Sequence, residues 1–271
     1  MDHLDRVVWL PEDWEALRRA RSVLERPSLA VKLVDAVGMP LERGLAVLPE
    51  RWGDLVQVAT QRALQRALDV AVDSLGTESG FSRDRFHRFA VAATGAGGGS
   101  FGLLGLAVEL PVSTTLMLRS IADIARREGE DLGQLEARLS CLEVFALGGR
   151  APRDDAAETG YFAVRAFLAG AVSDAARFVA QRGVVERGAP ALVRLIAAVA
   201  GRFGAVVSEK VAAMAVPVVG AVGGAAINSL FMSHFQKVAW GHFTVRRLER
   251  RYGTEAVRGT YDRLDDIRTV H

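Results

Sequence analysis

The chain has 271 residues, half of them hydrophobic, and its 34 basic and 32 acidic side chains leave a formal net charge of +2. This balance excludes the global excess of positive charge that draws a protein onto nucleic acid, so nucleic acid is not expected as a partner. The single cysteine, Cys141, excludes an internal disulfide and a cysteine-cluster metal site, and its apolar neighbours predict a buried thiol.

The first helix is expected over residues 11–26. Pro11 suits the first helical position, and Glu12 and Asp13 follow it in the first turn. The N-terminal stretch is charged and lacks the apolar core of a signal peptide, which favours a cytoplasmic protein. Residues 1–49 are interpreted as a helical extension and residues 50–271 as the main helical domain.

Apolar residues recur at helical spacing along most of the chain, and alternating strand patterns are scarce. Leu55, Ala59 and Leu64 mark one predicted apolar face, and Tyr161 and Phe167 belong to another. The sequence therefore predicts an all-α, compact multi-helix bundle, with helices over residues 54–75, 130–149, 154–182 and 190–200.

Two segments carry almost no charge. Residues 89–118 contain one charged side chain, Glu109, and residues 211–232 contain none. Each segment has a glycine cluster and a proline (Pro111 and Pro217), and each continues into an amphipathic charged helix. We expect two glycine-rich apolar helical hairpins at the centre of the bundle. Whether this shared plan is a weak internal repeat is left open by the sequence.

Residues 97–102 fit the GxGxxG pattern of a dinucleotide-binding turn. That fold needs further β-strands to build a parallel sheet, and none is predicted after the glycines. A Walker-type phosphate loop is excluded because no GK[ST] follows. No cofactor is therefore expected.

Close helix packing explains the glycines better, because small residues four apart let two helix backbones approach. A third interpretation is contact with lipid, since residues 212–231 are long enough to span a bilayer. Pro217 and the excess of Ala and Gly favour a protein core over insertion, with membrane-surface contact left open. The predicted packing glycines are Gly95, Gly98, Gly99, Gly102, Gly220 and Gly224.

Glu109 and Asn228 are the candidate polar residues of the two apolar segments. Glu109 is expected at a helix N-terminus or turn before Pro111, paired with Arg119 or a backbone amide. Alternatively, it is a buried carboxylate beside a ligand cavity. Asn228 either satisfies buried backbone groups or orients a polar head group.

His234 and His242 complete the candidate ligand-binding residues. They are eight residues apart, about 12 Å along a straight helix, so they do not share a metal without a third element. No HExxH motif occurs, and no metal is expected. The structural alternative is that each histidine caps a helix or packs beside an aromatic ring, such as Phe235 or Phe243. His87 and Glu249 are further candidates for chemistry.

A basic run follows the second apolar segment, beside an apolar stripe that includes Val245 and Leu248. It is interpreted as a solvated face, or alternatively as a surface for anionic lipid or a membrane-protein partner. Its members are Arg246, Arg247, Arg250 and Arg251.

Three stretches carry a family resemblance: TGAGGGSFGLLGLAVELPVSTTLMLRSIADIARR at 94–127, GYFAVRAFLA at 160–169, and residues 208–253. Within the third, PVVGAVGGA at 217–225 followed by Asn228 is the most specific. In order and spacing the chain resembles the EcsC protein family over most of residues 50–265. The resemblance implies a bacterial, largely helical protein with a membrane-linked accessory role, since the founding member is encoded beside two components of an ABC transporter. It implies no established catalytic mechanism or ligand.

Three functions are compatible with these observations. The first is a non-enzymatic, cytoplasmic accessory protein, peripheral on the inner face of the membrane or bound to a membrane transport system. The second is a soluble carrier that holds a lipid or other apolar ligand between the glycine-rich hairpins. The third is a hydrolase assembled from Glu109 and the histidines.

Overall fold

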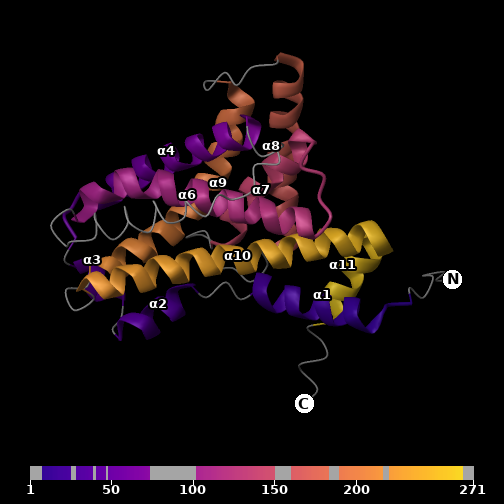
Figure 1. Ribbon diagram of the computed structural model, residues 1–271, viewed down its shortest axis with the longest axis horizontal. Coiled ribbons are helices and arrows are strands. Elements are labelled where there is room, and N and C mark those ends of the chain that lie inside the picture. Colours follow the sequence, from indigo (N-terminus) through magenta and orange to yellow (C-terminus); the bar gives the residue numbers. More distant parts are fainter. Residues whose placement is uncertain are drawn as a thin grey trace.

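The computed structural model describes residues 8–25, 29–38, 41–46, 48–73, 102–149, 160–182, 189–215 and 220–264. These residues form ten helices and no strand, which confirms the predicted all-α bundle (Figure 1). The helices are α1 (Pro11–Leu24), α2 (Leu29–Val37), α3 (Leu41–Ala46), α4 (Trp52–Asp73), α6 (Gly102–Arg127), α7 (Leu135–Leu147), α8 (Tyr161–Arg182), α9 (Pro190–Met214), α10 (Gly220–Tyr252) and α11 (Thr254–Arg263).

Helices α6 and α10 run parallel and side by side through the bundle (Figure 1). The amide of Gln236 on α10 donates to the Ser120 hydroxyl on α6 at 2.9 Å, across 116 residues of sequence. Ten residues further on, Arg246 contacts Glu130 across the same separation of 116 residues. Helix α10 therefore runs beside α6 and then beside the turn that follows it. The shared plan of the two segments thus places their charge-poor halves together and their charged halves together.

Pro111 does not begin a helix, contrary to the prediction for Glu109 and its surroundings. It lies inside α6, and Glu109 is in the body of the same helix. A proline normally disturbs a helix because it lacks an N–H and crowds the preceding turn. The Ser113 hydroxyl donates to the Leu110 carbonyl at 3.1 Å, and the Thr115 hydroxyl donates to the Pro111 carbonyl at 2.8 Å. These two bonds give the carbonyl groups of Leu110 and Pro111 a hydrogen-bond donor, and the helix continues to Arg127.

The two glycine-rich hairpins are not confirmed. Gly95, Gly98 and Gly99 lie outside the described residues, while Gly102 begins α6 and Gly220 begins α10. A Cβ added to Gly224 would meet no atom of the described residues within 4 Å, so close packing at this position is not seen there.

Close approach occurs instead at two glycines that the spacing did not indicate. A Cβ on Gly44 of α3 would overlap the carbonyl oxygen of Ala212 on α9. A Cβ on Gly149, just after α7, would overlap the carbonyl oxygen of Arg202 on α9. Both glycines therefore allow another segment's backbone to lie directly against α9.

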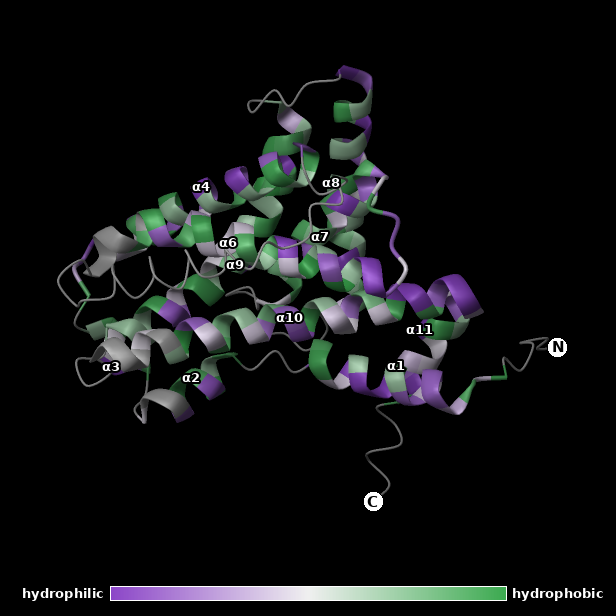
Figure 2. Ribbon diagram, viewed as in Figure 1, coloured by the Kyte–Doolittle hydropathy of each residue, from purple (hydrophilic) through white to green (hydrophobic). Residues whose placement is uncertain are grey.

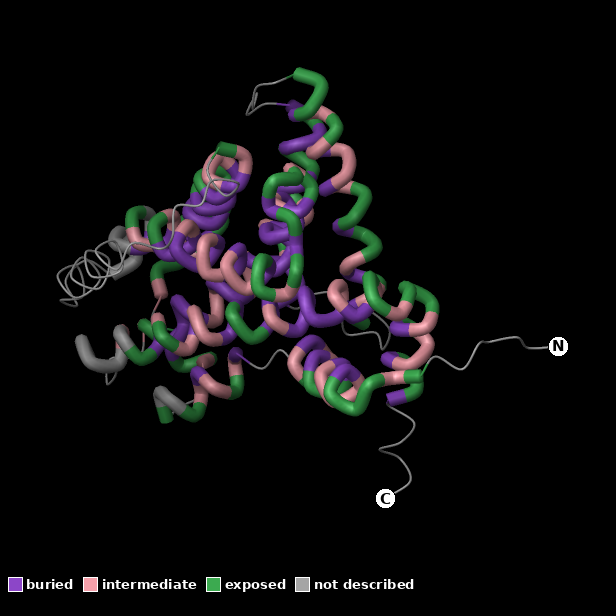
Figure 3. The backbone as a smooth tube through the Cα atoms, turned by 45° about the vertical axis from the view of Figure 1, so that its right-hand side comes forward, coloured by how far each residue is buried: buried purple, intermediate pink, exposed green. Residues whose placement is uncertain are grey.

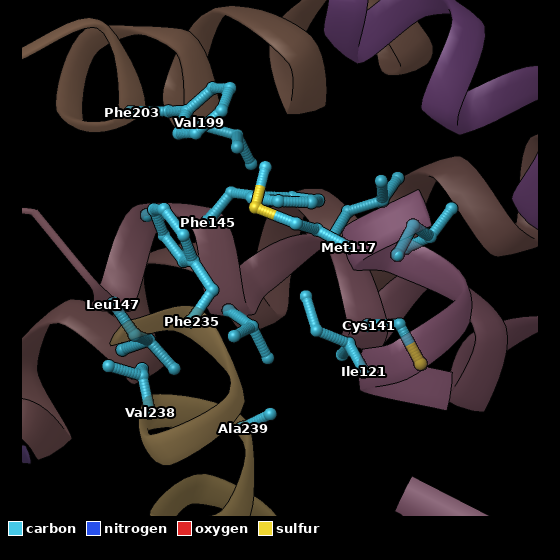
Figure 4. Close-up of a cluster of buried hydrophobic side chains, with 14 of the residues drawn as sticks. Met117, Ile121, Cys141, Phe145, Leu147, Val199, Phe203, Phe235, Val238 and Ala239 are labelled. Carbon is cyan, nitrogen blue, oxygen red and sulfur yellow. The ribbon is translucent and has the colours of Figure 1, made fainter. Parts of the chain in front are cut away.

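The core is aromatic where α6, α7, α9 and α10 meet (Figure 4). The ring of Phe145 on α7 lies 4.9 Å from that of Phe203 on α9 and 5.4 Å from that of Phe235 on α10. Met117 on α6 reaches the same cluster. Cys141 is fully buried nearby, as predicted, and burial raises the pKa of its thiol.

The N-terminal helix α1 packs on the second half of α10 (Figure 1). Leu17, Ala20 and Leu24 are buried on its inner face. Gly241 of α10 sits opposite Leu24, where an added Cβ would lie 3.1 Å from the leucine Cγ. Figure 3 shows the same division along the other helices, with buried residues on facing sides and exposed residues outward.

Candidate functional site

Glu109 forms an ion pair with Lys210 of α9, where the sequence suggested Arg119 or a backbone amide as its partner. The Nζ atom of Lys210 lies 2.6 Å from Oε1 of Glu109. The lysine side chain is 1% exposed and the glutamate side chain 17% exposed. The pair thus joins α6 to α9, with the ammonium inside the protein and the carboxylate reaching its surface.

The ring of Phe231 on α10 completes this site. The Lys210 ammonium lies 4.8 Å from the ring centroid, a cation–π geometry. Asn228 is one helical turn before Phe231, and its Oδ1 atom is buried without a hydrogen-bond partner among the described residues. The structure therefore pairs the predicted Glu109 with Lys210, which the sequence did not indicate, and no hydrogen bond joins Asn228 to this pair among the described residues.

This polar centre lies at the end of the bundle where α4, α6 and α10 begin and α9 ends (Figure 1). Several large hydrophobic side chains are exposed there, and we call this region the apolar end. They are Leu55 and Val58 on α4, Val108 and Val112 on α6, and Met214 on α9. Hydrophilic residues gather instead on α1, α11 and the last turns of α10 (Figure 2).

Helix α9, which ends at the apolar end, is long and apolar enough to cross a membrane by length and composition alone. Of its most apolar 18-residue stretch, 33% is buried within the protein. Among the described helices it is the one that meets these criteria. A core helix of a soluble protein can meet them too, so the composition of α9 permits lipid contact without establishing it.

A second polar centre surrounds His242, far from the apolar end. The Nδ1 atom of His242 lies 2.9 Å from the Tyr161 hydroxyl on α8. Arg165 donates to the same hydroxyl at 3.4 Å and forms a bidentate pair with Glu249, at 2.9 and 2.6 Å. On the other side, His242 Nε2 lies 3.7 Å from Oε2 of Glu143 on α7. We call these five residues the buried polar cluster.

Burial dominates the protonation of this cluster. It holds the pKa of His242 well below its ordinary value, and the nearby Arg165 and Arg246 charges act in the same direction. Burial likewise raises the pKa of Glu143 to about 7. His242 is therefore neutral at pH 7, and Glu143 exchanges its proton near neutrality.

His234 caps a helix end and packs beside an aromatic ring, which is the structural alternative expected for it from the sequence. Its Nε2 atom lies 2.7 Å from the carbonyl oxygen of Gly148, which caps α7. Because a carbonyl only accepts hydrogen bonds, Nε2 is the donor and carries the proton. Burial lowers the pKa of His234 to about 4, and its ring packs edge-on against Phe235. This histidine joins α10 to the end of α7.

The four predicted surface arginines are paired within the chain. Arg246 forms a bidentate pair with Glu130, with both nitrogen–oxygen distances at 2.9 Å. Arg250 also contacts Glu130 and donates to the carbonyl of Glu128 at 2.6 Å. Burial would raise the pKa of Glu130, but its bonds to Arg246 and Arg250 hold that pKa below its ordinary value.

The other two arginines bind the N-terminal helix. Asp13 of α1 accepts hydrogen bonds from Arg247 and Arg251 at 2.9 Å each, and from the Tyr252 hydroxyl at 2.8 Å. Arg247 also donates to Glu128 at 2.9 Å. The basic run thus holds α1 and the turn after α6 against α10, and three carboxylates of the same molecule offset most of the charge of its four arginines.

The structure separates the residues that a hydrolase would have to bring together. His242 is 11 residues beyond Phe231, the residue of α10 that contacts the Glu109 partner Lys210, and this is about 17 Å along the helix axis at 1.5 Å per residue. Among the described residues, Glu109 pairs with Lys210, His234 bonds the Gly148 carbonyl and His242 bonds the Tyr161 hydroxyl, so no hydrogen bond joins Glu109 to either histidine. His87 lies outside the described residues. No group of three or more metal-ligating side chains is present in the part of the chain that the structure describes.

The fold and these sites define an all-α helical bundle. One end of the bundle is apolar and carries the Glu109–Lys210 ion pair, and the arginines of the basic run are paired with carboxylates of the same chain. The chain belongs to the EcsC protein family, whose model matches residues 40–248. The match begins before α3 and ends within α10, so α1 and α2 precede it. No curated protein and no solved structure matches the chain.

Sequence reasoning missed Lys210, Glu143, Tyr161 and Arg165 as members of polar centres. Lys210 had the clearest signal, because it is one of three lysines and directly precedes a charge-free apolar segment. Tyr161 and Arg165 are one helical turn apart inside one of the stretches quoted for the family resemblance. Glu143 carried no distinguishing pattern of its own.

Proposed function

We propose that this EcsC-family protein is a non-enzymatic accessory protein that docks peripherally on a membrane through its apolar end. The observation that carries the proposal is the exposure of Val108 and Val112 on consecutive turns of α6, at 72% and 45%. Apolar side chains at this exposure gain free energy when they enter hydrocarbon.

Neighbouring surfaces support a lipid partner over a charged protein. The first half of α10, residues 220–236, carries no acidic or basic side chain apart from His234, whose pKa is low. In the described part of α6 before Arg119, Glu109 is the one charged residue, and it is paired. These parts of α6 and α10 carry no net charge, which suits the interior of a bilayer better than a salt-bridged interface.

The basic run adds little to this proposal. Arg246 and Arg247 are bound by Glu130, Asp13 and Glu128, so their attraction to anionic head groups is reduced. Docking is consequently expected to depend on apolar insertion more than on lipid charge.

The test is co-flotation of purified protein with vesicles, comparing wild type with V108E/V112E. The double variant places two carboxylates on the apolar end and should lose most of its binding. V193E is the matched control, because Val193 is 50% exposed on α9 near the start of that helix. If V193E abolishes binding and V108E/V112E does not, the contact lies elsewhere. If wild type remains unbound but self-associates, the apolar end is a contact between two copies of this chain and the proposal is wrong.

A further inference from the structure

Glu109 presents a difficulty for any entry of the apolar end into lipid. Its carboxylate is 17% exposed and is flanked on α6 by the exposed Val108 and Val112. An ionised carboxylate is among the most unfavourable groups to move into hydrocarbon. A surface selected only for apolar contact would carry no acid at this position.

Lys210 compensates the charge of Glu109 from inside the protein. Its side chain is 1% exposed, and its ammonium is directed to Glu109 Oε1 at 2.6 Å and to the face of Phe231. Burying a lysine for a single ion pair is a poor way to stabilise a soluble bundle, since an apolar residue of similar volume often does better. With Lys210 in this position, Glu109 is present at the surface as half of an ion pair that has no net charge.

We infer that Lys210 is a positioning residue for membrane docking, which cancels the charge of Glu109 where α6 meets the hydrocarbon. This inference rests on the proposed function. Lys210 does not touch the lipid itself; it removes the electrostatic penalty of the residue that does. The pair also leaves a polar point on the apolar end, which limits the depth of insertion and keeps the protein peripheral.

The competing explanation is that the pair only fastens α6 to α9. The two explanations differ in the behaviour of folded variants. K210M leaves the Glu109 carboxylate without its cation, whereas E109Q/K210M removes both charges of the pair. K237M is the matched control, because Lys237 is an exposed lysine in the middle of α10 and the substitution changes the net charge equally.

Partitioning of the four proteins onto phosphatidylcholine vesicles, with folding checked by thermal unfolding, tests the inference. Relative to wild type, we expect K210M to bind at least tenfold more weakly, E109Q/K210M to bind within about threefold, and K237M to be unchanged. If K210M does not fold, K210Q replaces it, because its amide keeps a polar group at this buried position while the cation is lost.

Two outcomes overturn the inference alone: folded K210M that binds as wild type does, or a double variant that binds as poorly as K210M. Wild type that fails to bind overturns the proposed function, and this inference with it. The wild-type measurement therefore distinguishes failure of the proposed function from failure of this inference alone.

Discussion

His242 Nε2 and Glu143 Oε2 lie 3.7 Å apart, and their side chains are 0% and 3% exposed. His242 Nδ1 lies 2.9 Å from the Tyr161 hydroxyl, which also accepts a hydrogen bond from Arg165, and His242 Nε2 has no hydrogen-bond partner among the described residues. At 3.7 Å the contact of Nε2 with Glu143 is longer than a hydrogen bond. Glu143 is consequently a buried acid whose ionised form is poorly compensated.

E143Q should change the pH dependence of stability. The folded-state pKa of about 7 is above the ordinary 4.5, so the folded protein binds the proton more tightly than the unfolded chain. The contribution of Glu143 is fully present below pH 4.5 and is lost as the pH rises to 7, by about 3 kcal/mol. Urea unfolding at pH 5 and pH 8 covers most of this range and should show wild type losing about 2.5 kcal/mol of stability relative to E143Q. Parallel pH profiles for the two proteins would contradict the assignment.

D13A should loosen the N-terminal helix. Asp13 accepts bonds from Arg247, Arg251 and Tyr252, so its removal leaves two guanidinium groups without this acceptor. We expect the free energy of unfolding to fall by about 2 kcal/mol, and proteolysis near α1 to accelerate. E15A is the control on the same helix, because Glu15 forms only an exposed pair with Arg18, and no measurable change is expected. Equal effects of the two variants would show that Asp13 does not hold α1 in place.

Gly149 and Gly201 should respond to alanine with opposite signs. An added methyl at Gly149 would overlap the Arg202 carbonyl oxygen and lie 2.7 Å from Val206 Cγ2, so G149A should destabilise the protein by about 1–3 kcal/mol. Gly201 lies inside α9 with open space around it, and G201A should stabilise by up to about 1 kcal/mol. Thermal unfolding of the two single variants measures both changes. If G149A leaves the stability unchanged, the backbone at residue 149 moves away from α9 at little cost in free energy.

Local patterns predicted the helices because helical spacing and helix ends are encoded by neighbouring residues. Pro11 marks the first residue of α1, and Ala59 and Leu64 are buried on α4 as their spacing indicated. The same spacing misplaced Leu55 and Phe167, which are 43% and 69% exposed. Periodicity identifies an apolar face but not whether another helix covers it, and that coverage depends on the tertiary arrangement.

The polar centres were less predictable because their members are distant in sequence. Glu109 and Lys210 are separated by 101 residues, and Glu143 and His242 lie on different helices. Asn228 was a candidate because it lies in a charge-poor segment, but the sequence could not indicate which groups would surround its buried Oδ1 atom. Arg246 was read as part of a surface, since nothing near it in sequence indicates Glu130 as its partner.

The most direct test of the account is flotation of the wild-type protein with neutral phosphatidylcholine vesicles at low and at high salt. Docking through Val108, Val112 and the neutral Glu109–Lys210 pair predicts binding to neutral lipid that persists at high salt, since apolar burial is not screened. Binding that requires anionic lipid and disappears in salt would contradict the account and return the contact to the basic run that includes Arg247 and Arg251.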